Sequence, residues 1–372
     1  MTEAWDRSPP LRLLPAQARI EVLDQTRLPI DHVHVSLDTL SDCALAISSM
    51  LVRGAPLIGL TGAGGLAVAV SSDPGDAALT RAVELLAGTR PTAVNLRWAL
   101  ERMRDRLLVA PVPERRALAW QLAGALQTAE HACCEAIGVH GAGLIRDAWR
   151  NERVAARGCV NILTHCNAGW LATGAWGTAL APVYRAWRDG IPVHVWVDET
   201  RPRNQGARLT AWELREAGIP HTLVVDNAAG HLMQRGEVDI CFVGSDRTTA
   251  SGDVCNKIGT YQKALAAADN RIPFHVALPV STIDWSIDDG IDGIPIESRS
   301  EDEILLQEGM SDCGTVHLIR QSPPGTRAAN PAFDVTPARL VSSLVCEHGV
   351  FPASRDALAP LRAMAVHGRA AL

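Results

Sequence analysis

Helical periodicity dominates the first 150 residues of the chain. Apolar positions recur every three to four residues in segments rich in Ala, Leu, Arg and Glu, which favour helix. This pattern predicts helices over residues 77–86, 96–108 and 115–136. The apolar segment 57–70 has 14 residues and four glycines. It is too short to span a bilayer and indicates a buried helix or turn. Short strands are expected before these helices, at 20–23 and 33–35.

After about residue 155, short apolar runs rich in β-branched residues alternate with helical segments. Strands are predicted at 160–164, 193–197, 222–225, 240–243 and 274–278, and a sixth at 316–319. Helices are predicted between them at 173–188, 207–217 and 257–268, whereas 284–295 has the composition of a loop. Buried strands that alternate with helices indicate a doubly wound parallel sheet. Ligands bind beyond the carboxyl ends of such strands, so polar residues that directly follow a strand are the candidates for function.

Composition narrows the functional classes. The 372 residues carry a formal net charge of −6, which offers no basic excess for nucleic acid or an anionic membrane. The nine cysteines form no C-x-x-C pair, and the first residues do not resemble a signal peptide. We therefore expect reduced thiols and a cytoplasmic location. Of the 35 basic residues only two are lysines, Lys257 and Lys263. Genomic drift toward arginine at surface positions explains the large number of arginines, but it does not explain why lysine is kept at these two positions.

The first polar cluster, 164–169, follows the predicted strand 160–164 and contains Cys166. A strand, a glycine-containing turn and then a helix would present this cysteine near a helix N-terminus, where a thiolate is favoured. The alternative is that Cys166 is one of nine mostly buried small hydrophobic residues. His165 is a conceivable base, but neighbours on an extended strand point to opposite faces.

Two further clusters follow strands. Residues 198–206 combine carboxylates with Arg201 and Arg203, and these guanidinium groups suit either a phosphate or a salt-bridged loop. Residues 244–253 include Asp246, placed as an acid of raised pKa past a buried strand, and Asp253, a weaker candidate that fits an N-cap. Lys257 follows them and is either a phosphate ligand or a residue of a first helical turn at the surface.

A fourth cluster, Arg-Gly-Ala-Pro at 53–56, lies in the helical half and offers an arginine beside open backbone. The glycines that follow match neither a P-loop nor a dinucleotide-binding fingerprint. Metal-binding H-x-x-x-H and H-E-x-x-H spacings are absent from the sequence, as is a G-x-S-x-G elbow. We therefore expect neither a metal nor a nucleotide cofactor.

Taken together, these motifs resemble the family of 5-methylthioribose-1-phosphate isomerases, within the initiation factor 2B alpha/beta/delta-like superfamily. The resemblance runs from about residue 20 to 355 and rests on seven segments, at 53–56, 90–96, 158–169, 198–214, 244–247, 252–261 and 330–337. It implies a mainly helical N-terminal domain with a small β element over residues 1–150 and a Rossmann-like catalytic domain over 151–372. It also implies a homodimer and a role in methionine salvage.

The resemblance also assigns roles to residues. The family's catalytic cysteine and aspartate fall on Cys166 and Asp246. Its substrate contacts fall on Arg53, Gly54, Ala55, Arg97, Gln205, Asn256 and Lys257. This sequence departs from the commoner pattern at Arg203-Asn204, Cys255 and Ser298, and none of these departures removes a catalytic side chain.

The implied reaction converts an aldose 1-phosphate into a ketose 1-phosphate. The phosphoester at C1 prevents ordinary ring opening, so a protonated Asp246 is expected at the ring oxygen. Hydrogen then passes from C2 to C1, either as a proton relayed by Cys166 or as a hydride that Cys166 shelters. A ribose-1,5-bisphosphate isomerase and a non-catalytic regulatory subunit that senses sugar phosphates or nucleotides are the alternatives.

Overall fold

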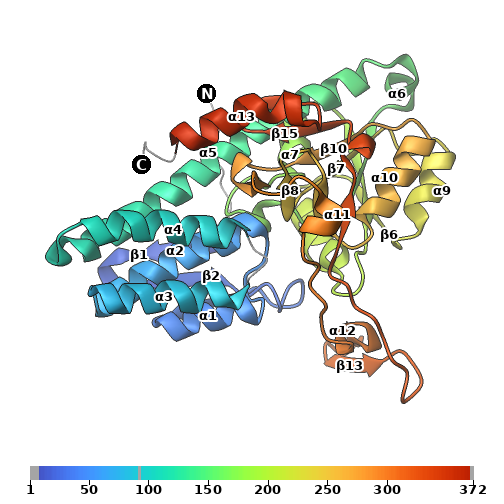
Figure 1. The fold of residues 1–372 in the computed structure, drawn as a ribbon. Coiled ribbons are helices and arrows are strands. Elements are labelled where there is room, and N and C mark those ends of the chain that lie inside the picture. The colour runs from blue at the N-terminus through green and yellow to red at the C-terminus, as the bar shows by residue number, and fades with distance from the viewer. Residues whose placement is uncertain (1–7, 91–93, 369–372) are drawn as a thin grey trace.

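The computed structural model describes residues 8–90 and 94–368. Its N-terminal part has a three-stranded antiparallel sheet followed by five helices (Figure 1). The strands are β1 (Leu11–Leu14), β2 (Arg19–Leu23) and β3 (His34–Leu37), of which β1 was not predicted. The helices are α1 (Leu40–Ser48), α2 (Ala55–Ser72), α3 (Asp76–Thr89), α4 (Val94–Val109) and α5 (Arg115–Trp149). The three predicted helices are confirmed as α3, α4 and α5, and α5 continues well beyond residue 136.

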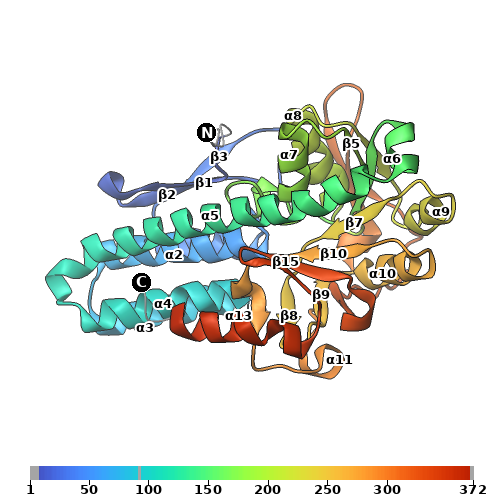
Figure 2. The same ribbon diagram turned by 90° about the horizontal axis from the view of Figure 1, so that it is seen from above.

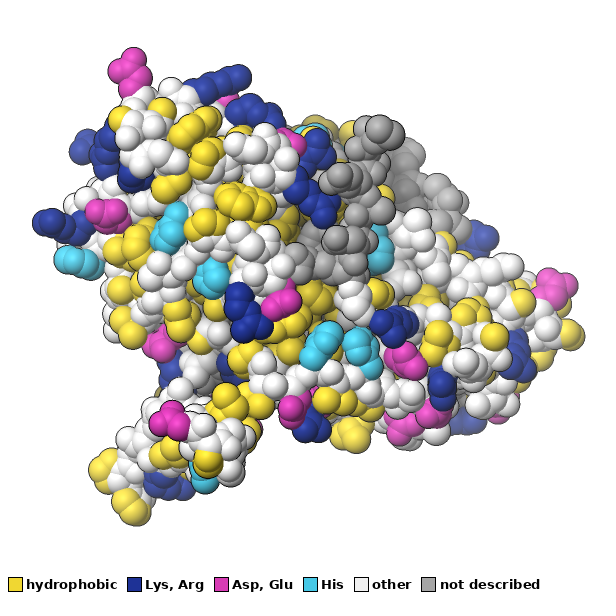
Figure 3. Space-filling model, turned by 180° about the vertical axis from the view of Figure 1, so that it is seen from behind, with side chains coloured by type: hydrophobic (Ala, Val, Ile, Leu, Met, Phe, Trp, Pro, Cys, Tyr) yellow, Lys and Arg dark blue, Asp and Glu magenta, His cyan; other side chains and the backbone are white. Residues whose placement is uncertain are grey.

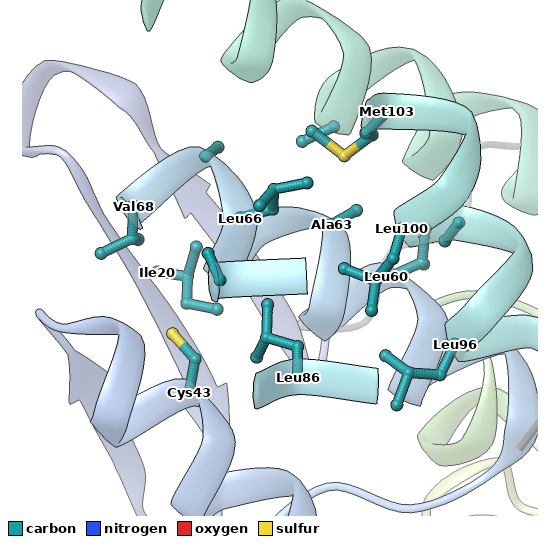
Figure 4. Packing of buried hydrophobic residues seen from close by; sticks show 14 of the residues in the cluster. Ile20, Cys43, Leu60, Ala63, Leu66, Val68, Leu86, Leu96, Leu100 and Met103 are labelled. Carbon is teal, nitrogen blue, oxygen red and sulfur yellow. The ribbon is translucent and has the colours of Figure 1, made fainter. Parts of the chain in front are cut away.

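Helix α2 is the centre of the N-terminal core. It packs against α1, α3, α4 and α5, and Leu60, Ala63 and Leu66 lie between these helices (Figure 4). The helix has 18 residues, long and apolar enough to cross a membrane, yet 83% of that window is buried within the protein. We therefore interpret α2 as the core helix of a globular domain, which agrees with the buried helix predicted at 57–70.

The C-terminal part contains a seven-stranded sheet in the order β16-β15-β10-β7-β4-β5-β6. All neighbouring pairs are parallel except β15 with β16. The five predicted strands are confirmed as β4 (Val160–Thr164), β5 (Val193–Asp198), β6 (His221–Val224), β7 (Ile240–Val243) and β10 (Phe274–Ala277). The remaining two are β15 (Ser343–Cys346) and β16 (Gly349–Phe351). The doubly wound α/β fold is thereby confirmed.

Alternating residues of the central strands enter two different cores. Ile162 and Phe242 pack with α5 and α7 (Ala181–Arg188), whereas their neighbours Leu163 and Val243 pack with α9 (Ala228–Gln234) and α10 (Thr260–Asp269). Because successive strand side chains point to opposite faces, helices cover both faces of the sheet (Figure 2). The remaining helices are α6 (Glu152–Arg157), α8 (Ala211–Glu216), α11 (Gly290–Gly293), α12 (Asp302–Leu305) and α13 (Arg355–Gly368).

Helix α5 joins the two parts and belongs to both cores. Its residues up to Leu126 pack in the N-terminal core, and those from Cys134 onward pack with the sheet and α7. The helix therefore passes from one core to the other well before residue 150 (Figure 2). The domain boundary at 150/151 stays a prediction.

A second, four-stranded sheet lies beside the first, and one of its strands includes a residue that was predicted to be helical. Its order is β11 (Ile283–Asp284), β8 (Arg247–Thr249), β9 (Val254–Lys257) and β14 (Phe333–Thr336). The helix predicted at 257–268 was wrong at its start, because Lys257 ends β9 and pairs with Phe333 of β14. The prediction at 173–188 was also too long, since α7 begins only at Ala181, where Pro182 occupies its first turn.

A two-stranded arm projects from the C-terminal part, built from β12 (Leu306–Met310) and β13 (Val316–Arg320). The strand predicted at 316–319 is therefore present, but it belongs to this arm and not to the parallel sheet. Apolar side chains of the arm remain exposed, among them Met310, Leu318 and Ile319 (Figure 3).

Candidate active site

A cavity of about 80 Å³ lies where the N-terminus of α2 meets the loops that follow β4 and β7. Of the sequence-predicted site residues, the structure brings eight together in its lining: Arg53, Gly54, Ala55, Cys166, Gln205, Asp246, Asn256 and Lys257. These residues come from both parts of the chain. The cavity therefore lies at the junction of the two cores, at the carboxyl edge of the parallel sheet, as expected for this fold class.

The first turn of α2 presents backbone amides to this cavity. Gly54 caps the helix with φ of +90°, and a Cβ there would lie 2.5 Å from the Cβ of Ala172, so only glycine fits. Pro56 lies in the first turn, where its lack of an N–H costs no hydrogen bond within the helix. A helix N-terminus lined by Arg53 favours an anionic group such as a phosphate.

The loop that carries Cys166 is held in an unusual backbone conformation. Cys166 has φ of +66°, its N–H donates to Thr200 Oγ1 at 2.8 Å, and its carbonyl accepts from Thr210 Oγ1 at 2.7 Å. No α-helix begins directly after this turn, as the prediction required: a single 3-10 turn at Trp170–Ala172 follows, and α7 begins only at Ala181. Burial raises the pKa of the Cys166 thiol, although the charges of Arg53 and Lys257 oppose this shift. The thiol is therefore protonated near neutral pH.

Behind Cys166, a buried carboxylate organises the loop. Glu213 on α8 has no exposed surface and accepts hydrogen bonds from Asn167 Nδ2, the backbone N–H groups of Trp170 and Leu171, and the Tyr184 hydroxyl. The guanidinium of Arg53 donates in turn to the side-chain and backbone oxygens of Asn167. Glu213 and Asn167 thus set the position of Arg53, and sequence reasoning missed both.

Asp246 follows β7, as predicted, and lines the cavity. Burial raises its pKa, and the positive charges of Lys257, Arg53 and Arg90 oppose this shift. A carboxyl group that keeps its proton above the ordinary range is suited to general acid catalysis.

Lys257 ends strand β9 and is buried, not a residue of a surface helical turn. Its ammonium donates to the carbonyl of Ala332 at 2.9 Å and lies 4.5 Å from the centre of the Phe333 ring. Burial lowers the pKa of Lys257, whereas negative charge on Cys166 or Asp246, when either is ionised, raises it. Neighbouring Asn256 donates to Thr260 Oγ1 at 3.0 Å.

Arg97 is not brought to the cavity, and Arg90 takes the place expected of it. Arg97 is exposed on α4 and is absent from the cavity lining. Arg90 lines the cavity, and its Nε and Nη1 are buried without a hydrogen-bond partner among the described residues. Its nearest acidic group is Glu297, at 3.8 Å from Nη2. Arg90 is the first residue of the family segment 90–96. The motif was therefore present in the sequence, but the substrate contact was assigned to Arg97, seven residues further along.

A second cavity, of about 330 Å³, adjoins the first and shares Met50, Arg53 and Gln205 with it. Its apolar lining includes Leu209, Leu306 and Leu318. Its other two arginines are already paired: Arg203 Nη1 lies 2.9 Å from Glu303 Oε1, and Arg208 Nη1 lies 2.8 Å from Glu308 Oε2. Polar residues such as Asn204 and Gln307 complete the lining, so this cavity offers apolar and polar surface together, with the charges of Arg203 and Arg208 neutralised.

His165, Asp198 and Asp226 place one potential metal ligand each within 4.8 Å of one another. However, the ammonium of Lys263 already lies 3.4 Å from Asp198 Oδ2, and His165 Nε2 faces the carbonyl of Ile258 at 2.8 Å. A divalent cation would have to displace both. We therefore interpret this group as an ion-pair cluster.

Comparison with known proteins gives consistent matches. Residues 51–353 match the model of the initiation factor 2 subunit family. A methylthioribose-1-phosphate isomerase of Methylorubrum extorquens is 58% identical over 92% of this chain and 93% of its own. The crystal structure of 5-methylthioribose 1-phosphate isomerase from Pyrococcus horikoshii is 35% identical and covers 96% of this chain and 97% of its own, with a TM-score of 0.81. The translation initiation factor eIF-2B subunit delta of A. fulgidus is also 35% identical, with a TM-score of 0.75 over 93% of this chain and 96% of its own.

Proposed function

We propose a reaction for this chain, which belongs to the methylthioribose-1-phosphate isomerases of the initiation factor 2 subunit family. The protein converts 5-methylthioribose 1-phosphate into 5-methylthioribulose 1-phosphate. The observation that carries the proposal is the convergence of a half-buried acid, Asp246, and a half-buried thiol, Cys166, on one cavity beside a helix N-terminus. A protein that only senses a sugar phosphate has no need of this pair.

Ring opening is the first chemical demand of this substrate. Because C1 carries a phosphoester, the ring oxygen must receive a proton while positive charge develops at C1. Asp246 is the proposed donor, since burial raises the pKa of its carboxyl and so favours the protonated form. Cys166 then assists the movement of hydrogen from C2 to C1, either as a proton relay or by sheltering a hydride shift.

The phosphate is the proposed anchor of the substrate. The first turn of α2 supplies backbone amides, and Arg53, Arg90 and Lys257 supply positive charge around the same cavity. Gln205 and Asn256 line this cavity as neutral polar groups and are proposed to contact the sugar hydroxyls.

The second cavity favours a methylthio group over a second phosphate. Arg203 and Arg208 are engaged by glutamates there, and Leu209, Leu306 and Leu318 add apolar surface to the lining. A ribose-1,5-bisphosphate isomerase would need a cation available at that end of the substrate. We therefore place the C5 substituent toward the second cavity.

A direct assay tests the function. The purified protein is incubated with 5-methylthioribose 1-phosphate and, separately, with ribose 1,5-bisphosphate, and ketose formation is followed. We expect turnover of the first and little or none of the second. A preference for the bisphosphate contradicts the proposed substrate, and no turnover of either contradicts an enzymatic function.

Replacement of Lys257 is expected to act mainly on substrate binding. Lys257→Ala removes a buried cation from the phosphate site, and loss of one such charge-assisted contact corresponds to a rise in KM of about 10- to 100-fold. Steady-state kinetics measure this rise, with kcat less affected. An unchanged KM in the folded variant would show that Lys257 is structural.

Arg90 and Arg97 form a matched pair that tests the corrected assignment. Arg90→Ala is expected to raise KM by about tenfold or more, because its guanidinium faces the phosphate site. Arg97→Ala removes the same side chain from the exposed face of α4 and should leave KM unchanged. The reverse result would restore the original assignment to Arg97.

We also propose a cytoplasmic homodimer. The exposed apolar residues of the β12–β13 arm, among them Met310, Leu318 and Ile319, support contact with another protein surface. All nine cysteines are free, which is consistent with a reducing compartment.

A further inference from the structure

Three buried side chains behind the Cys166 loop form a charged cluster that the proposed reaction does not use. His165 directly follows β4, Asp198 ends β5, and Lys263 lies on α10; each is at most 2% exposed. His165 Nδ1 lies 3.0 Å from Asp198 Oδ2, and Lys263 Nζ lies 3.4 Å from the same oxygen. A Cβ at Gly259 would lie 3.2 Å from both the His165 ring and Lys263 Nζ, so glycine lets the backbone close over the cluster.

Both ring nitrogens of His165 face oxygen atoms. The carbonyl of Ile258, 2.8 Å from Nε2, can only accept a hydrogen bond, so Nε2 must carry a hydrogen. At the other nitrogen, either an imidazolium donates to an Asp198 carboxylate, or a protonated Asp198 donates to a bare Nδ1. The ammonium of Lys263 beside the shared oxygen stabilises the carboxylate. A carboxylic acid also gives up its proton more readily than an imidazolium.

We propose that His165 is a doubly protonated positioning residue, whose imidazolium bridges the Asp198 carboxylate and the Ile258 carbonyl and thereby fixes the Cys166 loop. This inference rests on the role proposed for Cys166. It also gives Lys263, the second of the chain's two lysines, a specific place: it holds Asp198 in the charged form that the imidazolium requires.

The surrounding charges are consistent with two buried cations. Asp226, after β6, places Oδ1 at 3.9 Å from His165 Nδ1. Asp334 on β14 accepts from the N–H groups of Gly259 and Tyr261, and its charge interacts with His165 and Lys263. Three carboxylates thus face two cations, and neither cation is left as an uncompensated buried charge.

The contacts explain why the cluster acts on Cys166 more than on Lys257. Asp198 is connected to the Cys166 loop through Thr200, two residues further along the chain. The Thr200 hydroxyl donates to the Asp198 carbonyl and accepts from the Cys166 N–H. Lys257 precedes Ile258 in the chain, but its ammonium is fixed separately by Ala332 and Phe333. Loss of the imidazolium should therefore displace the thiol while leaving the proposed phosphate contact in place.

Nitrogen NMR of the histidine rings tests the charge directly. In ¹⁵N-histidine-labelled protein at pH 7, we expect both ring nitrogens of His165 to show the protonated pattern, with the signals assigned by their loss in His165→Gln. His275 is the internal reference: it is buried on β10 beside Ser343, burial lowers its pKa to about 4, and it must therefore show the neutral pattern. A neutral pattern for His165 overturns the proposal. Neutron crystallography of the wild-type protein reads the same two protons without any variant.

Kinetics test the positioning role. Asp198→Asn removes the negative charge, so His165 should become neutral by NMR and kcat should fall about 10- to 100-fold, with KM changed much less. His275→Gln, a buried strand histidine outside the cluster, should keep wild-type kcat. A folded Asp198→Asn variant with wild-type kcat overturns the positioning role. Absence of wild-type turnover contradicts the proposed function instead, because the NMR result does not depend on activity.

Discussion

Cys166→Ser is expected to lower kcat by at least about two to three orders of magnitude, the scale of losing an acid–base group. The substitution keeps the size and the hydrogen-bonding capacity of the side chain but replaces a thiol with a much weaker acid. The backbone contacts to Thr200 and Thr210 do not involve the sulfur, so the loop should keep its conformation. Steady-state kinetics measure kcat, and the thermal midpoint verifies folding.

Cys255→Ser is the matched control for this experiment. Cys255 lines the same cavity, from strand β9, and burial raises the pKa of its thiol to about 12. We expect this variant to keep kcat near the wild-type value, which would show that the loss belongs to Cys166 and not to any cavity thiol. Near-wild-type turnover in folded Cys166→Ser would remove Cys166 from the mechanism.

Asp246→Asn is expected to cause a loss of similar size, at least about two to three orders of magnitude in kcat. An amide cannot deliver a proton to the ring oxygen, although it has almost the same shape as the acid. In the wild-type protein, activity should fall as pH rises through the raised pKa of Asp246, because only the protonated form donates. This alkaline loss should be absent from the residual activity of the variant, as a pH series of kcat/KM would record.

Asp253→Asn provides the comparison for Asp246. Its carboxylate accepts from the backbone N–H groups of Gly290 and Ala338, a structural role that agrees with the weaker sequence candidacy. We expect lower thermal stability but kcat close to wild type. Equal losses in the two aspartate variants would indicate that Asp246 also acts through structure alone.

The sequence predicted the central sheet well because burial is a local property of its strands. Residues 160–164 are buried throughout and mostly apolar, residues 240–243 are all apolar, and the two segments match β4 and β7 to the residue. Lys257 was placed wrongly because its strand, β9, forms by pairing with β8 and with β14, and Lys257 itself pairs with Phe333, far along the chain. Local composition at 257–268 favours helix, and tertiary pairing overrides it for the first residues.

Six of the eight predicted residues that line the cavity came from the family's motifs, and the strand pattern by itself predicts a site residue only where that residue directly follows a strand. Cys166 and Asp246 meet that condition. Arg90 and Arg97 do not: Arg90 directly follows α3 and Arg97 lies on α4, so only the tertiary arrangement of these segments decides which arginine reaches the cavity. Glu213 gave no signal, because a glutamate on a short helix normally faces solvent. Its burial arises when the loop after Cys166 folds over it, where Gly169 leaves no room for a Cβ.

The two lysines have a consequence for the chemistry of the whole surface. Lys257 and Lys263 are both buried, at 8% and 2% exposure, and every other basic side chain apart from histidine is an arginine. Guanidinium groups do not acylate under conditions that modify amines. Beyond the terminal amine, the folded protein thus presents almost no primary amine to acylating reagents or to enzymes that modify lysine. Apart from histidine, the positive side chains at the surface are guanidinium groups, which stay protonated at any physiological pH. The two lysine amines both lie in the interior.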